Sequence, residues 1–193
     1  MLNALRLDTD RAMLLVIDVQ SGLLPAIVEH ESVLAATRQL LRAARLFELP
    51  VLATEQYPKG IGPTDASVAE LIQQTDAPVL EKSTFSACDD EPVREALRRI
   101  DRPQIVLCGI EAHVCVQQTA LDLVSLGHQV YVCADAVGSR RMLDRDVSLQ
   151  RMRQAGAIVT TSESVLFELC VECGTARFKE LLELVKAADQ GRA

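Results

Sequence analysis

The chain has 193 residues and a net charge of −7, which is enough length for one α/β domain with a sizeable core. The acidic balance argues against a nucleic-acid partner, and aromatic residues make up only 3% of the chain, so platforms for stacking bases are scarce. Because the apolar runs are short and residues 1–11 carry charges throughout, we expect no membrane partner and no secretory signal. Six cysteines in such a chain indicate a reducing, cytoplasmic setting.

Short apolar runs alternate with helical patterns along the chain. Strands are predicted over residues 13–18, 50–54, 78–81, 104–108, 129–133 and 157–161. Helices are predicted over residues 32–48, 67–74, 89–100, 113–126, 144–155, 163–169 and 175–188. Continuous apolar strands separated by helices are typical of a parallel sheet covered on both faces. With no internal linker, we expect a single three-layer αβα domain over residues 1–193, with six parallel strands in the order 3-2-1-4-5-6.

Three reactive side chains follow apolar strands in this pattern. Asp18 ends the first strand, Lys82 follows the third and Cys115 follows the fourth. Ligands of open parallel sheets bind beyond the carboxyl ends of the strands, where the strand order reverses. Taken singly, each residue is more often structural: a helix cap, a surface charge or a small buried side chain. An acid, an amine and a thiol at strand ends of one sheet instead favour covalent catalysis by a thiolate.

Cys115 is predicted to lie in the first turn of the helix over residues 113–126. The amides and dipole of a helix start, together with the charge of Lys82, would stabilise a thiolate, so we expect Cys115 to be the most reactive of the six thiols. Asp18 could take the thiol proton and later return it to a leaving group. The backbone amides of Glu111 and Cys115 are the candidate donors to an oxyanion.

Three motifs give the chain a specific resemblance. They are VIDVQ at residues 16–20, EKSTFS at residues 81–86 and GIEAHVCV at residues 109–116. In this order they resemble the motifs of the isochorismatase-like cysteine hydrolases, a superfamily that includes the nicotinamidases. The resemblance implies a doubly wound fold and an Asp18–Lys82–Cys115 catalytic triad. It also implies a cis peptide bond between Ile110 and Glu111.

Residues 54–64 and 108–112 narrow the resemblance to the isochorismatase domain-containing proteins. Nicotinamidases hold a metal through an Asp-x-His motif and a further histidine. This chain has only His30, His113 and His128, and none falls in the loop after the second strand. We therefore expect neither a metal nor any other cofactor.

Five residues near the three motifs are candidates for substrate binding. Gln20, Gln56, Tyr57, Phe85 and His113 each lie beyond a predicted strand end. Each has a plainer alternative: a polar loop residue for Gln20, a turn-packing residue for Tyr57, core packing for Phe85 and an exposed helix start for His113.

The predicted activity is hydrolysis of a small amide, imide or related C–N bond through an acyl-enzyme on Cys115, without a metal. Two alternatives stay open: hydrolysis of a vinyl ether, as in isochorismatase itself, and a non-catalytic interaction protein with a vestigial pocket. The expected partners are a small-molecule substrate and further copies of the chain in a dimer or tetramer. The basic run within residues 140–153 is either a solvated helix face or an oligomer contact.

Overall fold

The computed structural model describes residues 6–190, with side chains described up to residue 187. Six strands form one parallel sheet in the order β3-β2-β1-β4-β5-β6. Their bounds are Ala12–Ile17 (β1), Val51–Gln56 (β2), Val79–Lys82 (β3), Gln104–Ile110 (β4), Gln129–Gly138 (β5) and Ile158–Thr160 (β6). The predicted α/β class and strand order are therefore confirmed.

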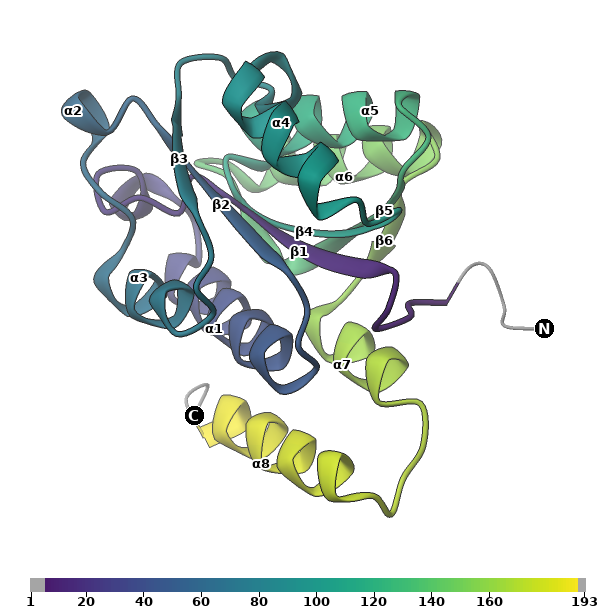
Figure 1. Cartoon of the computed structure of the whole chain (residues 1–193). Coiled ribbons are helices and arrows are strands. Elements are labelled where there is room, and N and C mark those ends of the chain that lie inside the picture. Colours follow the sequence, from purple (N-terminus) through teal and green to yellow (C-terminus); the bar gives the residue numbers. More distant parts are fainter. Residues whose placement is uncertain (1–5, 191–193) are drawn as a thin grey trace.

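Helices cover both faces of the sheet (Figure 1). One face carries α4 (Glu91–Ile100), α5 (Gln117–Ser125) and α6 (Met142–Gln154). The other carries α1 (His30–Leu46), α3 (Ala66–Gln73), α7 (Ser162–Cys170) and α8 (Ala176–Gln190). The short helix α2 (Pro58–Ile61) and the 3-10 turns at Leu24–Ala26 and Ala87–Asp89 lie in connections. Within residues 6–190, no helix combines the length and apolarity that crossing a membrane requires.

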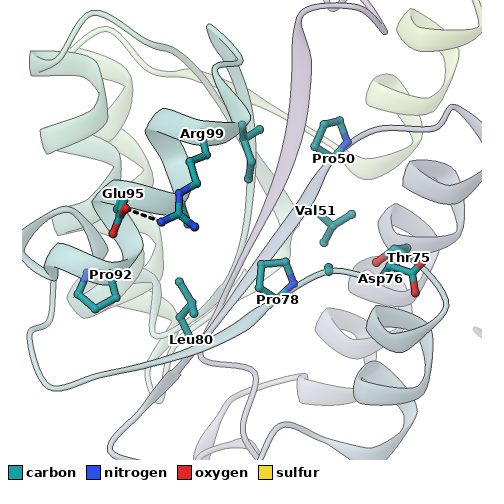
Figure 2. A pocket seen from close by; sticks show the side chains of 12 residues that line it. Pro50, Val51, Thr75, Asp76, Pro78, Leu80, Pro92, Glu95 and Arg99 are labelled. Carbon is teal, nitrogen blue, oxygen red and sulfur yellow. Dashed lines mark hydrogen bonds and ion pairs between the residues drawn. The ribbon is translucent and has the colours of Figure 1, made fainter.

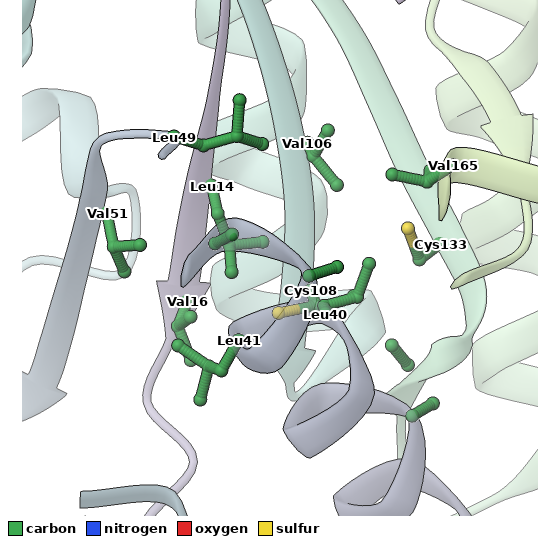
Figure 3. Packing of buried hydrophobic residues seen from close by; sticks show 14 of the residues in the cluster. Leu14, Val16, Leu40, Leu41, Leu49, Val51, Val106, Cys108, Cys133 and Val165 are labelled. Atoms are coloured by element: carbon green, nitrogen blue, oxygen red, sulfur yellow. The ribbon is translucent and has the colours of Figure 1, made fainter. Parts of the chain in front are cut away.

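The β1 strand shows why the sheet forms the middle layer. All six of its residues are buried, and successive side chains of a strand point to opposite faces. Leu14 and Val16 join the core beneath α1, which Figure 3 shows around Leu40 and Leu41. The alternate residues of β1 join the second core beneath α4, α5 and α6. Burying one leucine side chain stabilises the fold by about 1.5–3 kcal/mol, so a polar residue in β1 would disrupt one of the two cores.

The strand order reverses between β1 and β4, and these two strands approach unusually closely at their carboxyl ends. Gly109 in β4 pairs with Ile17 in β1 and has a φ of 129°. A Cβ atom at Gly109 would lie 2.0 Å from the carbonyl oxygen of Ile17. Only glycine combines this dihedral with this approach, so Gly109 sets the spacing of the crevice that the topology predicts.

The β5 strand extends to Gly138, five residues beyond the sequence prediction. Its register with β4 is irregular, because an advance of two residues in β4, from Leu107 to Gly109, is matched by an advance of five in β5, from Val132 to Val137. Short polar interruptions such as Asp135 end an apolar pattern in the sequence, although the strand resumes after them. The extension carries Ser139 and Arg140 to the carboxyl edge of the sheet, beside the end of β4.

Candidate active site

Asp18 follows β1 directly and is fully buried. Its φ of 52° lies in the left-handed region, which aspartate tolerates better than most residues. One carboxylate oxygen, Oδ1, accepts a hydrogen bond from Thr54 Oγ1 at 2.7 Å. The other, Oδ2, accepts from Lys82 Nζ at 2.7 Å. A carboxylate held from both sides keeps one orientation, as a positioned proton acceptor requires.

Lys82 ends the edge strand β3, and its side chain is enclosed by oxygen atoms. Besides Asp18, its Nζ donates to Gln56 Oε1 at 2.7 Å and approaches the carbonyl oxygens of Thr84 and Phe85 at 3.2 and 3.4 Å. These partners replace the water that burial removes. Removing one member of such a buried ion pair typically costs about 3–5 kcal/mol, because the other charge is left without compensation.

Cys115 lies in the π-helical turn η3 (Ala112–Val116), just before α5, and not in the first turn of an α-helix. Its side chain packs in the core on the α5 side, and the residue is 7% exposed. The Sγ atom lies 4.0 Å from Gln56 Oε1, the same oxygen that Lys82 contacts. Gln56 therefore joins the amine and the thiol.

Burial is the main reason that the pKa of the Cys115 thiol rises to about 12, and the Asp18 carboxylate adds to the increase. Charge and hydrogen bonding from Lys82 oppose it but do not overcome it. Burial thus favours a protonated thiol at neutral pH, in contrast to the thiolate that the sequence predicts. At that pH the exposed Cys173 should react with alkylating agents before Cys115. The interactions with Asp18 and Lys82 nevertheless bring all three predicted residues together.

The turn η3, which contains Cys115, is attached to the end of β5. The peptide bond between Ile110 and Glu111 is cis. Glu111 Oε2 accepts from both the backbone N and the Nε of Arg140, each at 3.0 Å. His113 Nδ1 lies 3.0 Å from Ser139 Oγ. These contacts fix the turn that contains Cys115, and the amides of Glu111 and Cys115 stay the proposed oxyanion donors.

The predicted substrate-binding residues separate into two groups. Gln20 is buried, and its Nε2 donates to the carbonyl oxygens of Gln56 and Gly62 at 3.1 and 2.6 Å. Its Oε1 accepts from Gln56 N at 2.8 Å, so Gln20 braces the loop after β2. Tyr57 and Phe85, in contrast, are 59% and 56% exposed. Tyr57 comes directly after β2, which ends at Gln56, and Phe85 comes shortly after β3, which ends at Lys82. Both rings are therefore at the surface near the carboxyl ends of β2 and β3.

Thr54 contacts the Asp18 carboxylate but is not among the site residues that the sequence predicts. It is 1% exposed, and its backbone oxygen also accepts from Asp18 N at 3.1 Å. The available signal was a hydroxyl residue at the end of an apolar strand that neighbours β1. Hydroxyl residues are also common at the ends of strands that have no catalytic role, so the sequence alone does not single out Thr54.

Two further features bear on the location of the site. Among the described residues, no group of three or more His, Cys, Asp or Glu side chains is arranged to hold a metal ion. A hollow of about 480 Å³ is bordered by Pro50, Pro78 and the ion pair of Glu95 with Arg99 (Figure 2). It lies at the amino ends of β2 and β3, and so at the sheet edge opposite the triad. The reactive groups therefore do not face this hollow.

Fold and site together define an α/β protein of doubly wound topology with an acid, an amine and a thiol at its switch point. The family model of the isochorismatase domain matches residues 12–164, a range that includes all three groups. The chain belongs to the isochorismatase family, and thus to a superfamily of hydrolases. The predicted family is confirmed.

Individual relatives agree with this assignment. Isochorismatase domain-containing protein 2 of Xenopus laevis is 41% identical over 189 residues, which cover 96% of this chain and 90% of the relative. The MAR1 ribonuclease of Caenorhabditis elegans has a similar structure, with a TM-score of 0.88, 37% identity and coverage of 94% of this chain and 92% of that one. YcaC of Escherichia coli, an octameric hydrolase of unknown specificity, matches with a TM-score of 0.89, 27% identity and coverage of 98% and 96%. The predicted subgroup is likewise confirmed.

Proposed function

We propose that the protein hydrolyses a small amide, imide or related C–N bond through a covalent intermediate on Cys115. The observation that carries the proposal is the buried ion pair of Asp18 with Lys82 beside the Cys115 thiol. Burying two opposite charges is costly, and here the cost is incurred next to a nucleophilic side chain.

In the proposed reaction the thiol gives its proton to Asp18 as Sγ attacks the substrate carbonyl carbon. A C–S bond forms, and the carbonyl π electrons move to the oxygen. When that oxyanion collapses, the C–N bond breaks and the amine leaves with the proton from Asp18. Water then adds to the thioester with Asp18 as base, the C–S bond breaks, and the thiol regains its proton.

A Cys115 thiol that keeps its proton until the substrate binds is consistent with the proposed role of Asp18 as proton acceptor. Because burial and Asp18 both raise the pKa of Cys115, attack has to be coupled to proton transfer. Asp18 is the proposed base, and its interaction with the Cys115 thiol supports this role. Lys82 holds that base and offsets its charge, so it is a positioning residue.

The charges around the triad favour a small, neutral substrate. Lys82 already contacts four oxygen atoms, and Arg140 is paired with Glu111. Neither of these two cations is left to bind a substrate carboxylate, which disfavours the dianionic vinyl ether that isochorismatase cleaves. Cys115 is only 7% exposed, and the chain has a net charge of −7. Both features oppose an RNA substrate, although one structural relative is named a ribonuclease.

A substrate panel with mass detection tests the proposal. The protein would be incubated with small neutral amides and imides, a dianionic vinyl ether and RNA, with a chelator present throughout. We expect turnover of at least one neutral compound and an acyl adduct on Cys115, and neither with Cys115→Ala. Turnover of the vinyl ether or RNA alone, turnover that Cys115→Ala retains, or turnover lost with the chelator and restored by zinc would contradict it.

We also propose that the chain works as a homo-oligomer in the cytoplasm. The octameric state of YcaC supports self-association. All six cysteines are free thiols, which fits a reducing compartment.

A further inference from the structure

The outer surface of α6 carries a row of exposed side chains. Leu143 and Val147 lie one turn apart and are 72% and 53% exposed. Gln150 and Gln154 continue the same line and are also exposed. We call these four residues the α6 stripe. Exposed apolar side chains bordered by charges often mark an interaction surface.

Charges border the α6 stripe in a repeating way. Asp144 and Arg151 lie seven residues apart on one side of it, and Asp146 and Arg153 lie seven apart on the other. Seven residues are nearly two helical turns, so each pair shares a flank. Within the part of the chain that the structure describes, Asp144, Arg151 and Arg153 form no ion pair, and Asp146 contacts only its neighbour Arg145, at 3.3 Å.

We propose that the α6 stripe binds the α6 stripe of a second copy in an antiparallel arrangement. When a twofold axis relates two antiparallel helices, each flank of one helix faces the same flank of the other helix. The residues of the two facing flanks then run in opposite directions. Asp144 then meets Arg151 of the second copy, and Asp146 meets Arg153. A parallel arrangement would instead place aspartate near aspartate and arginine near arginine. Charge complementarity thus selects both the partner and its direction.

The inner side of α6 connects this surface to the nucleophile. α6 packs against η3, the turn that contains Cys115. Arg145 attaches the helix to β5 by donating from Nε to Val137 O at 3.1 Å and from Nη2 to Ala134 O. A second copy on the outer side would therefore support the element behind η3. The inference rests on the proposed self-association and not on the proposed hydrolysis.

Analytical ultracentrifugation over a concentration series tests the α6 contact. The variants are Val147→Lys, Asp144→Arg and the double swap Asp144→Arg with Arg151→Asp. Leu126→Lys is the matched control, because Leu126 is an apolar residue at the end of α5 with 64% exposure, between the values for Val147 and Leu143. We expect the unchanged chain to sediment as a dimer or a multiple of one. The two single variants should dissociate to half that mass, with a dissociation constant raised at least about tenfold.

The double swap should restore association, because it exchanges the two charges and keeps them complementary. Restored association would also show that the doubly substituted chain folds. Leu126→Lys should sediment like the unchanged chain. Single variants that associate normally, or a double swap that stays dissociated, would overturn the α6 contact while leaving self-association standing. A chain that is monomeric at every concentration would overturn both. Because none of these results depends on turnover, they leave the proposed hydrolysis to its own test.

Discussion

The carboxylate of Asp18 is held by a neutral donor and a charged donor at equal distances of 2.7 Å. Its neighbours Lys82 and Cys115 could be predicted because each carries reactive chemistry at a strand end. Thr54 could not, since a hydroxyl at a strand end carries no such signal. The protonation state of Cys115 was also beyond prediction, because it depends on how completely the thiol is buried.

Thr54 offers a test of positioning at the scale of one residue. Thr54→Val keeps the shape and removes the hydroxyl that donates to Asp18 Oδ1. Losing one buried hydrogen bond costs about 1–3 kcal/mol, so we expect kcat to fall about tenfold or more with little change in KM. A variant with unchanged kcat would show that Thr54 does not position Asp18. Thr119→Val, at a buried threonine that contacts Ala87, is a control for loss of a buried hydroxyl.

Among the elements, β5 and η3 depart most from the sequence prediction. Both departures come from backbone geometry that side-chain periodicity does not encode: an irregular register in β5 and a π-helical turn where an α-helix is predicted. The sequence could predict that a helix follows β4 and that Cys115 lies near its start. It could not predict that Ser139 and Arg140 return to contact His113 and Glu111 beside Cys115.

Gly109 tests the close approach of β4 to β1. In Gly109→Ala the new Cβ would lie 2.0 Å from Ile17 O, so the strands must separate next to Asp18. We expect a loss of unfolding free energy of about 2–4 kcal/mol, measured by urea denaturation, and loss of turnover. Gly127→Ala is the matched control, because Gly127 also has positive φ, 89°, but nothing lies within 4 Å of its Cβ position. Equal losses in both variants would show that dihedral strain, and not the contact, is responsible.

For the whole molecule, the strand order followed from continuous apolar strands and short connections, which allow few topologies. The predicted bounds of the edge strands β3 and β6 differ from the observed ones by one residue at each end, although Val79 and Glu81 in β3 are exposed. The larger difference is in the interior strand β5, which extends five residues beyond its predicted end. An oligomer contact within residues 140–153 was one of two interpretations of the basic run there. The face now proposed for self-association could not be singled out, because an exposed leucine in a helix repeat looks the same in sequence as a buried one.

Alkaline pH tests the buried thiols of the whole fold. Burial raises the pKa of Cys88, Cys108 and Cys115 from 9.0 to about 12, and that of Cys133 well above 9.0. The folded state therefore holds these protons more tightly than the unfolded state. Their contribution to stability is complete below about pH 9 and is lost as the pH rises toward about 12.

Urea denaturation between about pH 8 and 11 checks this expectation. The unfolding free energy should fall with a slope of up to about 1.4 kcal/mol per pH unit for each thiol. Cys108→Ala should show a shallower slope, whatever its stability at pH 8. A free energy that stays constant over this range, or an unchanged slope in Cys108→Ala, would contradict the assignment of protonated buried thiols.

The pH dependence of Cys115 alkylation tests the triad most directly. Site-resolved iodoacetamide labelling would be followed for the unchanged chain, Asp18→Asn, Lys82→Met and the exposed control Lys186→Met. Asp18 raises the thiol pKa and Lys82 lowers it, so Asp18→Asn should move the alkylation midpoint to lower pH and Lys82→Met to higher pH. Asp18→Asn should nevertheless lose turnover by at least about 10²-fold, because a more acidic thiol does not replace the missing base. Lys186→Met should change neither quantity. If both triad variants leave the midpoint in place, or shift it in the same direction, Asp18, Lys82 and Cys115 do not act as one site.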